Sequence, residues 1–186
     1  WEPSYQWTEY CFQQEILKSG IRGWSVHPYG VKTPEEFSLG HARTRQLLQQ
    51  YGAPDMPLLN TERGFAVEQR RGAEEGWSGG SRERALEFQA WHFVRQIMVD
   101  LLNDVRLTVW YEWDGGDAWT GSAFALTEND GSLRPAGKAA QVMFDQLDGY
   151  RLAGRRNAGD KRDYALEFVN GSGDKKFVLW TSPAPG

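Results

Sequence analysis

Polar and aromatic residues follow three short apolar runs of this 186-residue chain. They are Asn60 and Glu62 in "PLLNTERGF", His27 and Tyr29 in "SVHPYG", and Trp110, Trp113 and Asp114 in "LTVWYEWDG". A carboxylate, an imidazole and a phenol that meet beside indole rings suit glycoside hydrolysis. In that reaction a carboxylate attacks the anomeric carbon and an aromatic face packs on the sugar. The pattern predicts a site of this kind, with Glu62 as the nucleophile.

Each of these residues also has a purely structural interpretation. Glu62 can form an ordinary surface ion pair with Arg63, His27 can be a hydrogen-bonded core histidine, and Trp110 can serve packing alone. A single polar residue at a strand end is weak evidence for a site. Three strand ends that carry such residues together favour a site over these alternatives.

The histidines and the cysteine lack the spacing of a metal site. The three histidines, His27, His41 and His92, fall on different predicted elements, and the single Cys11 leaves no close His/Cys spacing for a metal. We therefore expect no metal and no cofactor, and assign His41 and His92, which lie within predicted helices, to structure. Cys11 is expected to be a buried, inert thiol.

The segments that must position the candidate residues alternate between helix and strand. Helical spacing and caps predict helices at 8–20, 33–52 and 81–104, and apolar runs predict strands near 21–28, 56–64 and 105–113. Alternation at this pace implies βα units and a parallel sheet. In such α/β folds the loops beyond the carboxyl ends of the strands form the site. The three candidate groups are therefore expected on one edge.

The style of the sequence changes near its end. A last helix is expected after Pro135, and from about residue 150 the chain shows short alternating strands with "NGSG" as a hairpin turn. These features predict a small antiparallel β unit.

Composition excludes several partner classes. A net charge of −4 and a pI near 5.5, with acids and bases interspersed, give no basic face for a nucleic acid. No apolar stretch approaches the roughly 20 residues that cross a bilayer, and the start lacks a signal-peptide pattern. The 9 Trp residues supply more indole than an average chain needs, and indole faces also bind flat apolar ligand surfaces.

Several of these segments together resemble one known family. They are "WSVHPYG", "PLLNTERGF", "LTVWYEWDGGD", "FALTENDGSLRPAGKAA" and the final "LDGYRLAGRR", "DYALEF" and "KKFVLWTS". In order and spacing they are similar to the C-terminal half of a clan A glycoside hydrolase with a (β/α) barrel. The resemblance is closest to family 39 and to cellulase-like proteins with a β-sandwich flank.

The resemblance implies a fold and specific roles. It implies a partial, half TIM-type barrel over residues 1–148, about strands five to eight, and an antiparallel β appendage over 149–186. By the same resemblance Glu62 is the nucleophile, His27 and Tyr29 orient it and bind hydroxyls, and Trp110 stacks on the sugar. Trp113, Asp114, Asp117 and Trp119 follow in a loop that would extend the cleft.

The sequence departs from the family at the acid/base residue. The family carries this glutamate in an Asn-Glu-Pro motif at strand four, and the chain has no such motif. Glu2, in "WEP", lies only about 60 residues before Glu62. Three βα units of more than about 30 residues each should separate strands four and seven. The opening "EPSYQW" instead looks similar to the turn after strand five, so we expect the chain to begin within the barrel.

A half barrel would leave sheet edges and an apolar face uncovered. We therefore expect either a fragment or a chain that covers this face by assembling with itself or with a second chain.

The favoured function is a retaining glycosidase that degrades plant-type polysaccharides such as cellulose or xylan. Its acid would come from a partner chain, Glu112 or Glu2. The alternative function is a non-catalytic sugar-binding or assembly module. The family resemblance also implies that the protein is secreted.

Overall fold

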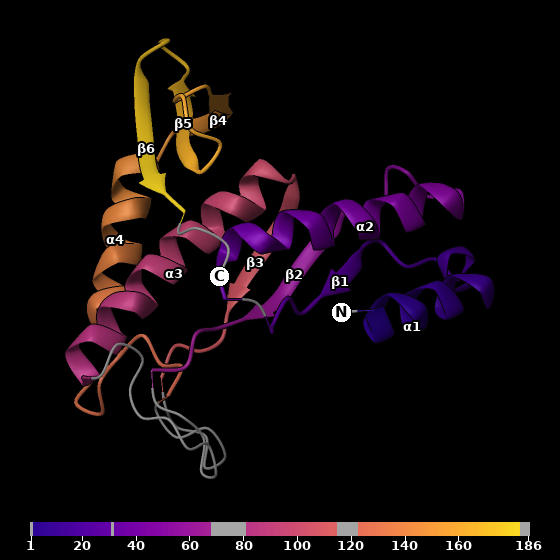
Figure 1. Ribbon diagram of the computed structural model, residues 1–186, viewed down its shortest axis with the longest axis horizontal. Helices are drawn as coiled ribbons and strands as arrows, with labels where there is room; N and C mark the ends of the chain where they lie inside the picture. Colours follow the sequence, from indigo (N-terminus) through magenta and orange to yellow (C-terminus); the bar gives the residue numbers. More distant parts are fainter. Residues whose placement is uncertain (1, 31, 68–80, 115–122, 183–186) are drawn as a thin grey trace. The chain divides into compact units, whose positions relative to one another are not determined.

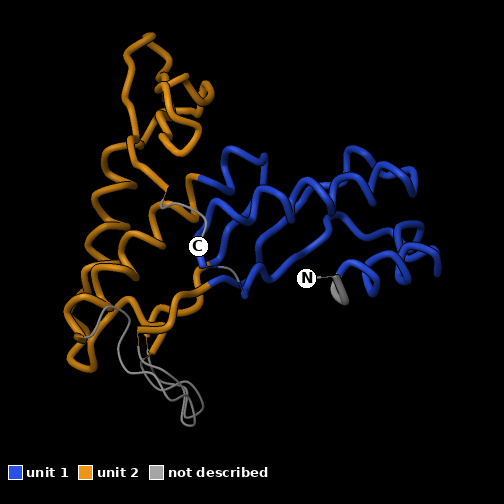
Figure 2. The backbone as a smooth tube through the Cα atoms, viewed as in Figure 1, with its two compact units in different colours: residues 1–63, 99–109 blue, residues 64–98, 110–186 orange. Residues whose placement is uncertain are grey.

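The computed structural model describes residues 2–30, 32–67, 81–114 and 123–182, of which residues 2–4 contribute only their backbone (Figure 1). The chain divides into two compact units (Figure 2). Unit 1 comprises Trp1–Arg63 and Val99–Val109, and unit 2 comprises Gly64–Met98 and Trp110–Gly186. Helices and a parallel sheet, together with a separate antiparallel sheet, confirm the expected α/β fold class with a partial barrel.

The parallel sheet contains three strands in the order β1, β2, β3 (Figure 1). They are β1 (Trp24–Val26), β2 (Leu58–Arg63) and β3 (Val105–Trp110). β1 and β2 run parallel, with Trp24 opposite Leu58 and Val26 opposite Asn60. Because parallel neighbours end at the same edge, His27, which follows β1, and Glu62, near the end of β2, lie at one edge of the sheet, as the sequence predicts.

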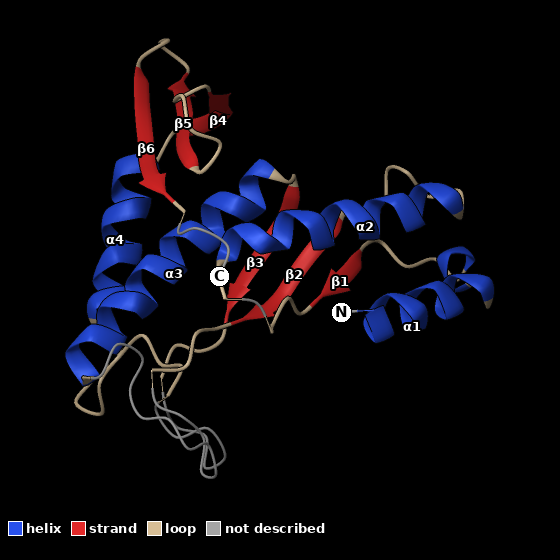
Figure 3. Cartoon of the chain, viewed as in Figure 1, coloured by secondary structure: helices blue, strands red, loops and turns tan. Residues whose placement is uncertain are grey.

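Two helices of unit 1 build a core with this sheet, α1 (Glu2–Gln13) and α2 (Phe37–Gln50) (Figure 3). One buried cluster draws on both helices and all three strands; it consists of Phe12, Trp24, Leu47, Leu48, Leu58 and Val105. Full burial of a leucine contributes about 1.5–3 kcal/mol relative to an exposed one. Cys11 packs against this cluster and is half-buried, so the expected fully buried thiol is only partly correct.

The first helix differs from the prediction at both ends. It begins at Glu2 and ends at Gln13, whereas helical spacing predicted residues 8–20. Glu15 has a φ of 61°, in the left-handed region that an α-helix does not use. A separate 3-10 turn follows at Ile16–Lys18. The helix therefore stops before the glycine that the sequence pattern took as its end.

The start of the second helix is as the sequence predicts. A 3-10 turn at Pro34–Glu36 leads into α2. Glu36 Oε1 accepts hydrogen bonds from the Thr33 backbone N–H and hydroxyl, each at 3.2 Å. Such contacts satisfy donors that the first turn of a helix leaves unpaired. Gly52, with a φ of 78°, follows the helix end.

The longest helix, α3 (Arg82–Leu102), begins at the predicted cap. The Ser81 hydroxyl accepts a hydrogen bond from the Arg84 backbone N–H at 3.1 Å. In unit 2, Glu128 accepts hydrogen bonds from Arg82 at 2.8 and 2.7 Å and lies 3.2 Å from Nε of Arg134. Arg134 immediately precedes α4 (Pro135–Leu147), so this carboxylate joins the starts of both helices. The Arg82 hydrogen bonds lower the pKa of Glu128.

The C-terminal strands form the predicted antiparallel sheet. They are β4 (Tyr150–Arg156), β5 (Asp163–Asn170) and β6 (Lys175–Thr181), in that order. In the predicted hairpin turn Asn170 Oδ1 accepts hydrogen bonds from the backbone N–H groups of Ser172 and Asp174. The domain boundary between residues 148 and 149 stays a prediction.

The third strand ends three residues earlier than predicted. β3 stops at Trp110, because Glu112 exchanges backbone hydrogen bonds with a later segment instead of with the sheet. Its N–H donates to Phe124 at 3.3 Å, and its carbonyl accepts from Leu126 at 3.1 Å. Among the helices in the described ranges, none is long and apolar enough to cross a membrane.

Candidate active site

Glu62 lies at the end of β2, and its side chain is 39% exposed. Burial alternates along the first residues of this strand, with Leu58 and Asn60 buried, and then the alternation breaks. Thr61 and Glu62 are both half-buried, and Arg63 is buried again. The break leaves two consecutive polar side chains accessible at the carboxyl end of the strand, where an α/β fold places its chemistry.

His27, which follows β1, is the residue that approaches Glu62. Its Nδ1 lies 3.8 Å from Oε2 of Glu62. Its Nε2 lies 3.0 Å from the Thr61 hydroxyl oxygen, and that hydroxyl also contacts the Ser25 hydroxyl. The structure thus brings two of the predicted residues together, and it adds Thr61 and Ser25, which the sequence analysis did not select.

Tyr29 contacts the residue after Glu62. The Arg63 guanidinium carbon lies 5.1 Å from the ring centres of Tyr29 and of Phe37. Arg63 is only 5% exposed, and burial lowers its pKa from 12.5 to about 10. Arg63 therefore stays charged at neutral pH and contacts aromatic faces. These contacts differ from the ordinary exposed ion pair with Glu62 that the sequence also allowed.

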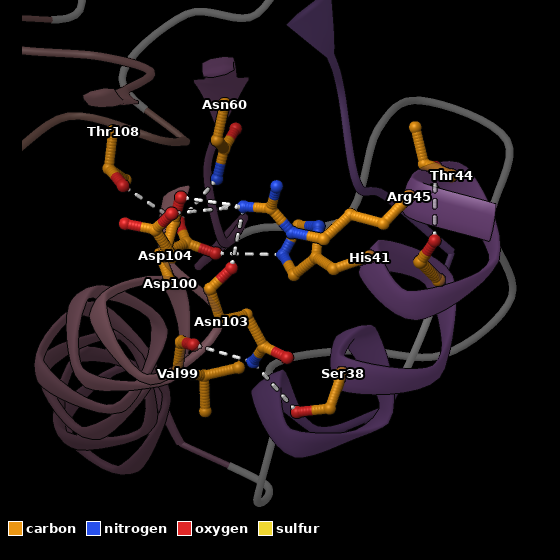
Figure 4. Close-up of polar contacts among 11 residues, drawn as sticks. Ser38, His41, Thr44, Arg45, Asn60, Val99, Asp100, Asn103, Asp104 and Thr108 are labelled. Carbon is orange, nitrogen blue, oxygen red and sulfur yellow. Dashed lines mark hydrogen bonds and ion pairs between the residues drawn. The ribbon is translucent and has the colours of Figure 1, made fainter. Parts of the chain in front are cut away.

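A buried aspartate anchors the strand that carries Glu62 (Figure 4). Asp100, 1% exposed on α3, accepts hydrogen bonds from three elements of unit 1. Its partners are His41 Nε2 at 3.0 Å, Asn60 Nδ2 at 2.8 Å and the Thr108 hydroxyl at 2.8 Å. A buried carboxylate needs such donors to offset its lost hydration. The structural role predicted for His41 is confirmed.

Asn60 therefore lies below the surface and not in a cleft. Its side chain is 0% exposed and donates to Asp100, while its Oδ1 makes no hydrogen bond within the described residues. The prediction that Asn60 binds substrate is not tested by this geometry, but a ligand would have to open the packing around β2 to reach it.

A cavity of about 600 Å³ in unit 1 opens beside the first strand end. His27 and Tyr29 line it together with α1 and α2 side chains, namely Tyr5, Trp7, Thr8, Phe37, His41 and Thr44. Trp7 is 63% exposed there. The cavity offers aromatic faces and a few polar groups, a composition that suits a small polar ligand with a flat apolar face.

The remaining candidate residues lie in unit 2. Trp110 packs on Phe93, with ring centres 5.0 Å apart, and its indole N–H lies 3.4 Å from the Phe124 carbonyl oxygen. Trp113 is 64% exposed and Asp114 is also exposed. Of the two tryptophans, Trp113 therefore presents the larger free face. Asp117 and Trp119 lie outside the described residues.

A glycine follows the nucleophile candidate for a steric reason. A Cβ atom on Gly64 would lie 2.1 Å from the Tyr111 carbonyl oxygen and 2.6 Å from the Phe124 ring. No side chain fits at that distance, so the backbone at residue 64 can approach the segment after β3 only as glycine. The sequence shows a glycine at this position in "TERG" but not that it lies against Tyr111 and Phe124.

His92 keeps the structural role predicted for it. Its ring lies 4.2 Å from that of Phe65, and Nδ1 lies 3.3 Å from the Phe88 carbonyl. Across the described ranges no three His, Cys, Asp or Glu side chains gather as metal ligands would.

Comparison with known proteins gives matches only among solved structures; no family model and no curated relative matches the chain. A family 39 glycoside hydrolase from Bacteroides cellulosilyticus WH2 matches with a TM-score of 0.62 and 19% identity, over 91% of this chain and 36% of that one. A glucosidase from Croceicoccus marinus matches with a TM-score of 0.60 and 21% identity, over 92% and 34%. A monomeric beta-xylosidase from Caulobacter crescentus CB15 gives a TM-score of 0.50 and 15% identity, over 84% and 35%.

These matches confirm the resemblance at the level of the fold. The chain spans about a third of the length of each of these three proteins. Most of this chain takes part in each match, as expected for a partial barrel with its β appendage. The chain has the fold of part of a family 39 glycoside hydrolase.

Proposed function

We propose that this chain carries the nucleophile half of a retaining β-glycosidase site, with Glu62 as the nucleophile. The observation that supports this most directly is the Glu62–His27 pair. A half-exposed carboxylate and an imidazole from the neighbouring strand lie 3.8 Å apart at the carboxyl edge of a parallel sheet. Glycosidase folds of this type hold their catalytic carboxylates at that edge.

The proposed chemistry has two steps. An oxygen of Glu62 bonds to the anomeric carbon as the glycosidic C–O bond breaks, and the departing oxygen takes a proton from a general acid. Water, deprotonated by the same group, then cleaves the glycosyl ester and restores the carboxylate. His27 and Tyr29 would orient Glu62 and bind sugar hydroxyls, and Trp113 or Trp110 would stack on the ring.

The described part of the fold lacks the Asn-Glu-Pro motif that usually carries the general acid. A retaining enzyme needs a second carboxyl about 5–5.5 Å from the first. These 186 residues contain no Asn-Glu-Pro, so the acid would come from outside them, as from a partner chain, or from Glu112 or Glu2. Without it the proposed site forms a glycosyl ester only with leaving groups that need no proton.

The proposed substrates are β-glucosides and β-xylosides. The matched structures include a glucosidase and a β-xylosidase, and the exposed indoles offer faces for a pyranose. Longer plant glycans such as cellulose and xylan extend this proposal. Asp114, which is exposed, would contribute to binding, whereas Asn60, which is buried against Asp100, would reach a substrate only if the packing around β2 opened.

The sheet that carries Glu62 also has uncovered apolar side chains. Leu107 and Val109, on one face of β3, are 47% and 41% exposed. Thr108, between them, bonds to Asp100 on α3, so the two apolar side chains point away from that helix. We propose that a second copy or a partner chain covers this face. A stable monomer in sedimentation at micromolar concentration would oppose this.

A non-catalytic sugar-binding or assembly module is the second candidate. Its specific support is the absent Asn-Glu-Pro motif, since a nucleophile and aromatic rings without an acid bind a glycan but protonate no leaving group. Under this proposal the chain binds glycans and hydrolyses none.

A trapping experiment separates the two proposals without needing the acid. The purified chain is incubated with 2,4-dinitrophenyl 2-deoxy-2-fluoro-β-glucoside and the matching xyloside. Dinitrophenolate leaves unprotonated, and the fluorine slows hydrolysis of the glycosyl ester. We expect a mass increase of one fluorosugar, mapped by peptide sequencing to Glu62 and missing from Glu62→Gln. An unlabelled native chain that still binds glycans would support the binding module instead.

A further inference from the structure

We propose that Thr61 is a positioning residue that fixes the tautomer of His27, so that Nδ1–H points at Glu62. This inference rests on the proposed function of Glu62. It concerns a residue that neither the sequence pattern nor the fold likeness selects. It also makes a claim about one imidazole that is measurable without any turnover.

The geometry is a continuous line of polar side chains on two strands. The Ser25 hydroxyl contacts the Thr61 hydroxyl, Thr61 Oγ1 lies 3.0 Å from His27 Nε2, and His27 Nδ1 lies 3.8 Å from Glu62 Oε2. The parallel pairing places Ser25 opposite Leu59, two residues before Thr61. Side chains two residues apart share a face of a strand, so the register brings Ser25, His27 and Thr61 together. Glu62 joins them where the alternation along β2 breaks.

The direction of the hydrogen bonds follows from the end of that line. An ionised Glu62 carboxylate can only accept, so in the proposed arrangement the His27 nitrogen that faces it carries the hydrogen. In a neutral imidazole the other nitrogen, Nε2, is then an acceptor, and it needs a donor. Thr61 supplies one, and its own oxygen remains able to accept from Ser25.

A hydroxyl is suited to this position because it serves both charge states of the ring. When His27 gains a proton, Nε2–H becomes a donor and the Thr61 oxygen accepts from it after the hydroxyl rotates. The ring therefore keeps its orientation toward Glu62 in both states. Distances at catalytic pairs are often long without substrate, and an oriented Nδ1–H can close the 3.8 Å separation when a sugar binds.

His41 provides an internal reference with the opposite tautomer. Its Nε2 lies 3.0 Å from Asp100 Oδ1 in the buried hub, so that nitrogen must carry the hydrogen. The chain holds 3 histidines, and two of them face carboxylates through different ring nitrogens. One spectrum therefore reports both tautomers under identical conditions.

The test is long-range ¹H–¹⁵N NMR of the full 186-residue chain labelled at histidine, recorded at a pH at which the imidazoles are neutral. His27→Gln assigns the His27 signals. In the native chain we expect the Nδ1–H form for His27 and the Nε2–H form for His41. Thr61→Val, which removes the hydroxyl at nearly constant shape, should move His27 largely to the Nε2–H form, and Thr61→Ser should keep the native form.

The controls separate positioning from folding and from function. An unchanged His41 signal in Thr61→Val shows that the fold is intact. If that variant does not fold, Ser25→Ala replaces it, and we expect this variant to weaken the Nδ1–H preference of His27 partly. An Nε2–H form of His27 in the native chain, or the same form in native and Thr61→Val, overturns the proposal. Labelling of Glu62 by the fluorosugar should slow about tenfold or more in Thr61→Val and recover in Thr61→Ser.

The two proposals fail in different ways. If the native chain shows the expected tautomer and Glu62 is not labelled, the nucleophile proposal fails and the positioning geometry stands. If Glu62 is labelled at the same rate in the native chain and in Thr61→Val, the positioning proposal fails and the nucleophile proposal stands.

Discussion

Glu62 in unit 1 and Glu167 in unit 2 are both glutamates on strands, and the groups around them differ. Glu167, on the central strand of the antiparallel sheet, accepts from Arg156 at 2.6 Å and pairs with Lys175 at 2.8 Å. These two cations lower its pKa to about 2, the Arg156 hydrogen bond most strongly. Glu62 has an imidazole at 3.8 Å and keeps 39% of its side chain exposed, against 6% for Glu167.

The difference indicates how to separate a structural carboxylate from a reactive one. A carboxylate held by two cations is a weak nucleophile, because attack would require it to give up its hydrogen bonds. A carboxylate oriented by one neutral or cationic ring keeps an oxygen for a substrate. Asp100 shows the extreme structural case, since it is buried and accepts three hydrogen bonds.

The largest expected effect comes from exchanging each glutamate for glutamine. Glu62→Gln should reduce fluorosugar labelling, and turnover where an acid is supplied, by about a thousandfold or more, because an amide does not attack the anomeric carbon. Glu167→Gln should label at the native rate. Mass spectrometry at several time points measures both, and equal losses in the two variants would remove the distinction between the carboxylates.

Removing the buried hub should have the next largest effect. Asp100→Ala leaves the polar groups of His41, Asn60 and Thr108 without their acceptor in a buried place, which should cost about 3–5 kcal/mol. Hydrogen exchange at the β2 amides in increasing urea reports this locally. Asp55→Ala, at an exposed position of the same unit, should stay within about 0.5 kcal/mol of the native chain. Equal protection in both variants would contradict the anchoring role.

A steric test follows at Gly64. Gly64→Ala places a methyl group 2.1 Å from the Tyr111 carbonyl oxygen, so the backbone must shift at a cost of about 1–3 kcal/mol. Gly171→Ala is the matched control, because a Cβ there meets nothing within 4 Å. Thermal unfolding of the two variants compares them. A Gly64→Ala chain as stable as the control would show that the two segments do not approach closely in solution.

The smallest expected effect is the pH dependence of the antiparallel sheet. The pKa of Glu167 is lowered in the fold from 4.5 to about 2, so the stability from its ion pairs is fully present above 4.5. It declines as the pH falls from 4.5 toward 2, because the unfolded chain takes up the proton first. Amide exchange of β5 across this range measures the decline. Glu167→Gln should lack this part of the pH dependence.

Local signals in the sequence were sufficient for most of the fold. The capping residues Thr33 and Ser81 start their helices as predicted, and the "NGSG" turn joins β5 to β6. These features depend on residues close in the chain. The first helix was misplaced because the left-handed backbone at Glu15 has no signal in its residue type.

The site divides in the same way. The order of residues determined that Glu62 and His27 each lie at a strand end, and parallel pairing then brings them to one edge. The resemblance to family 39, carried by strand-end motifs, also came from the sequence alone. The sequence did not show the partners of two other candidate residues. Asn60 donates a hydrogen bond to Asp100, and the Trp110 indole N–H donates to the Phe124 carbonyl.

What the sequence determined by itself is therefore the set of elements and the identity of the residues at their ends. Helical and strand periodicity, caps and turns act over a few residues, so a single chain displays them directly. The tertiary structure decided which polar groups are already satisfied. Asp100 meets His41 and Glu167 meets Arg156 only after folding, and Glu62 is left facing one imidazole. Hydrogen-bond saturation depends on contacts between distant segments, and residue type alone does not encode it.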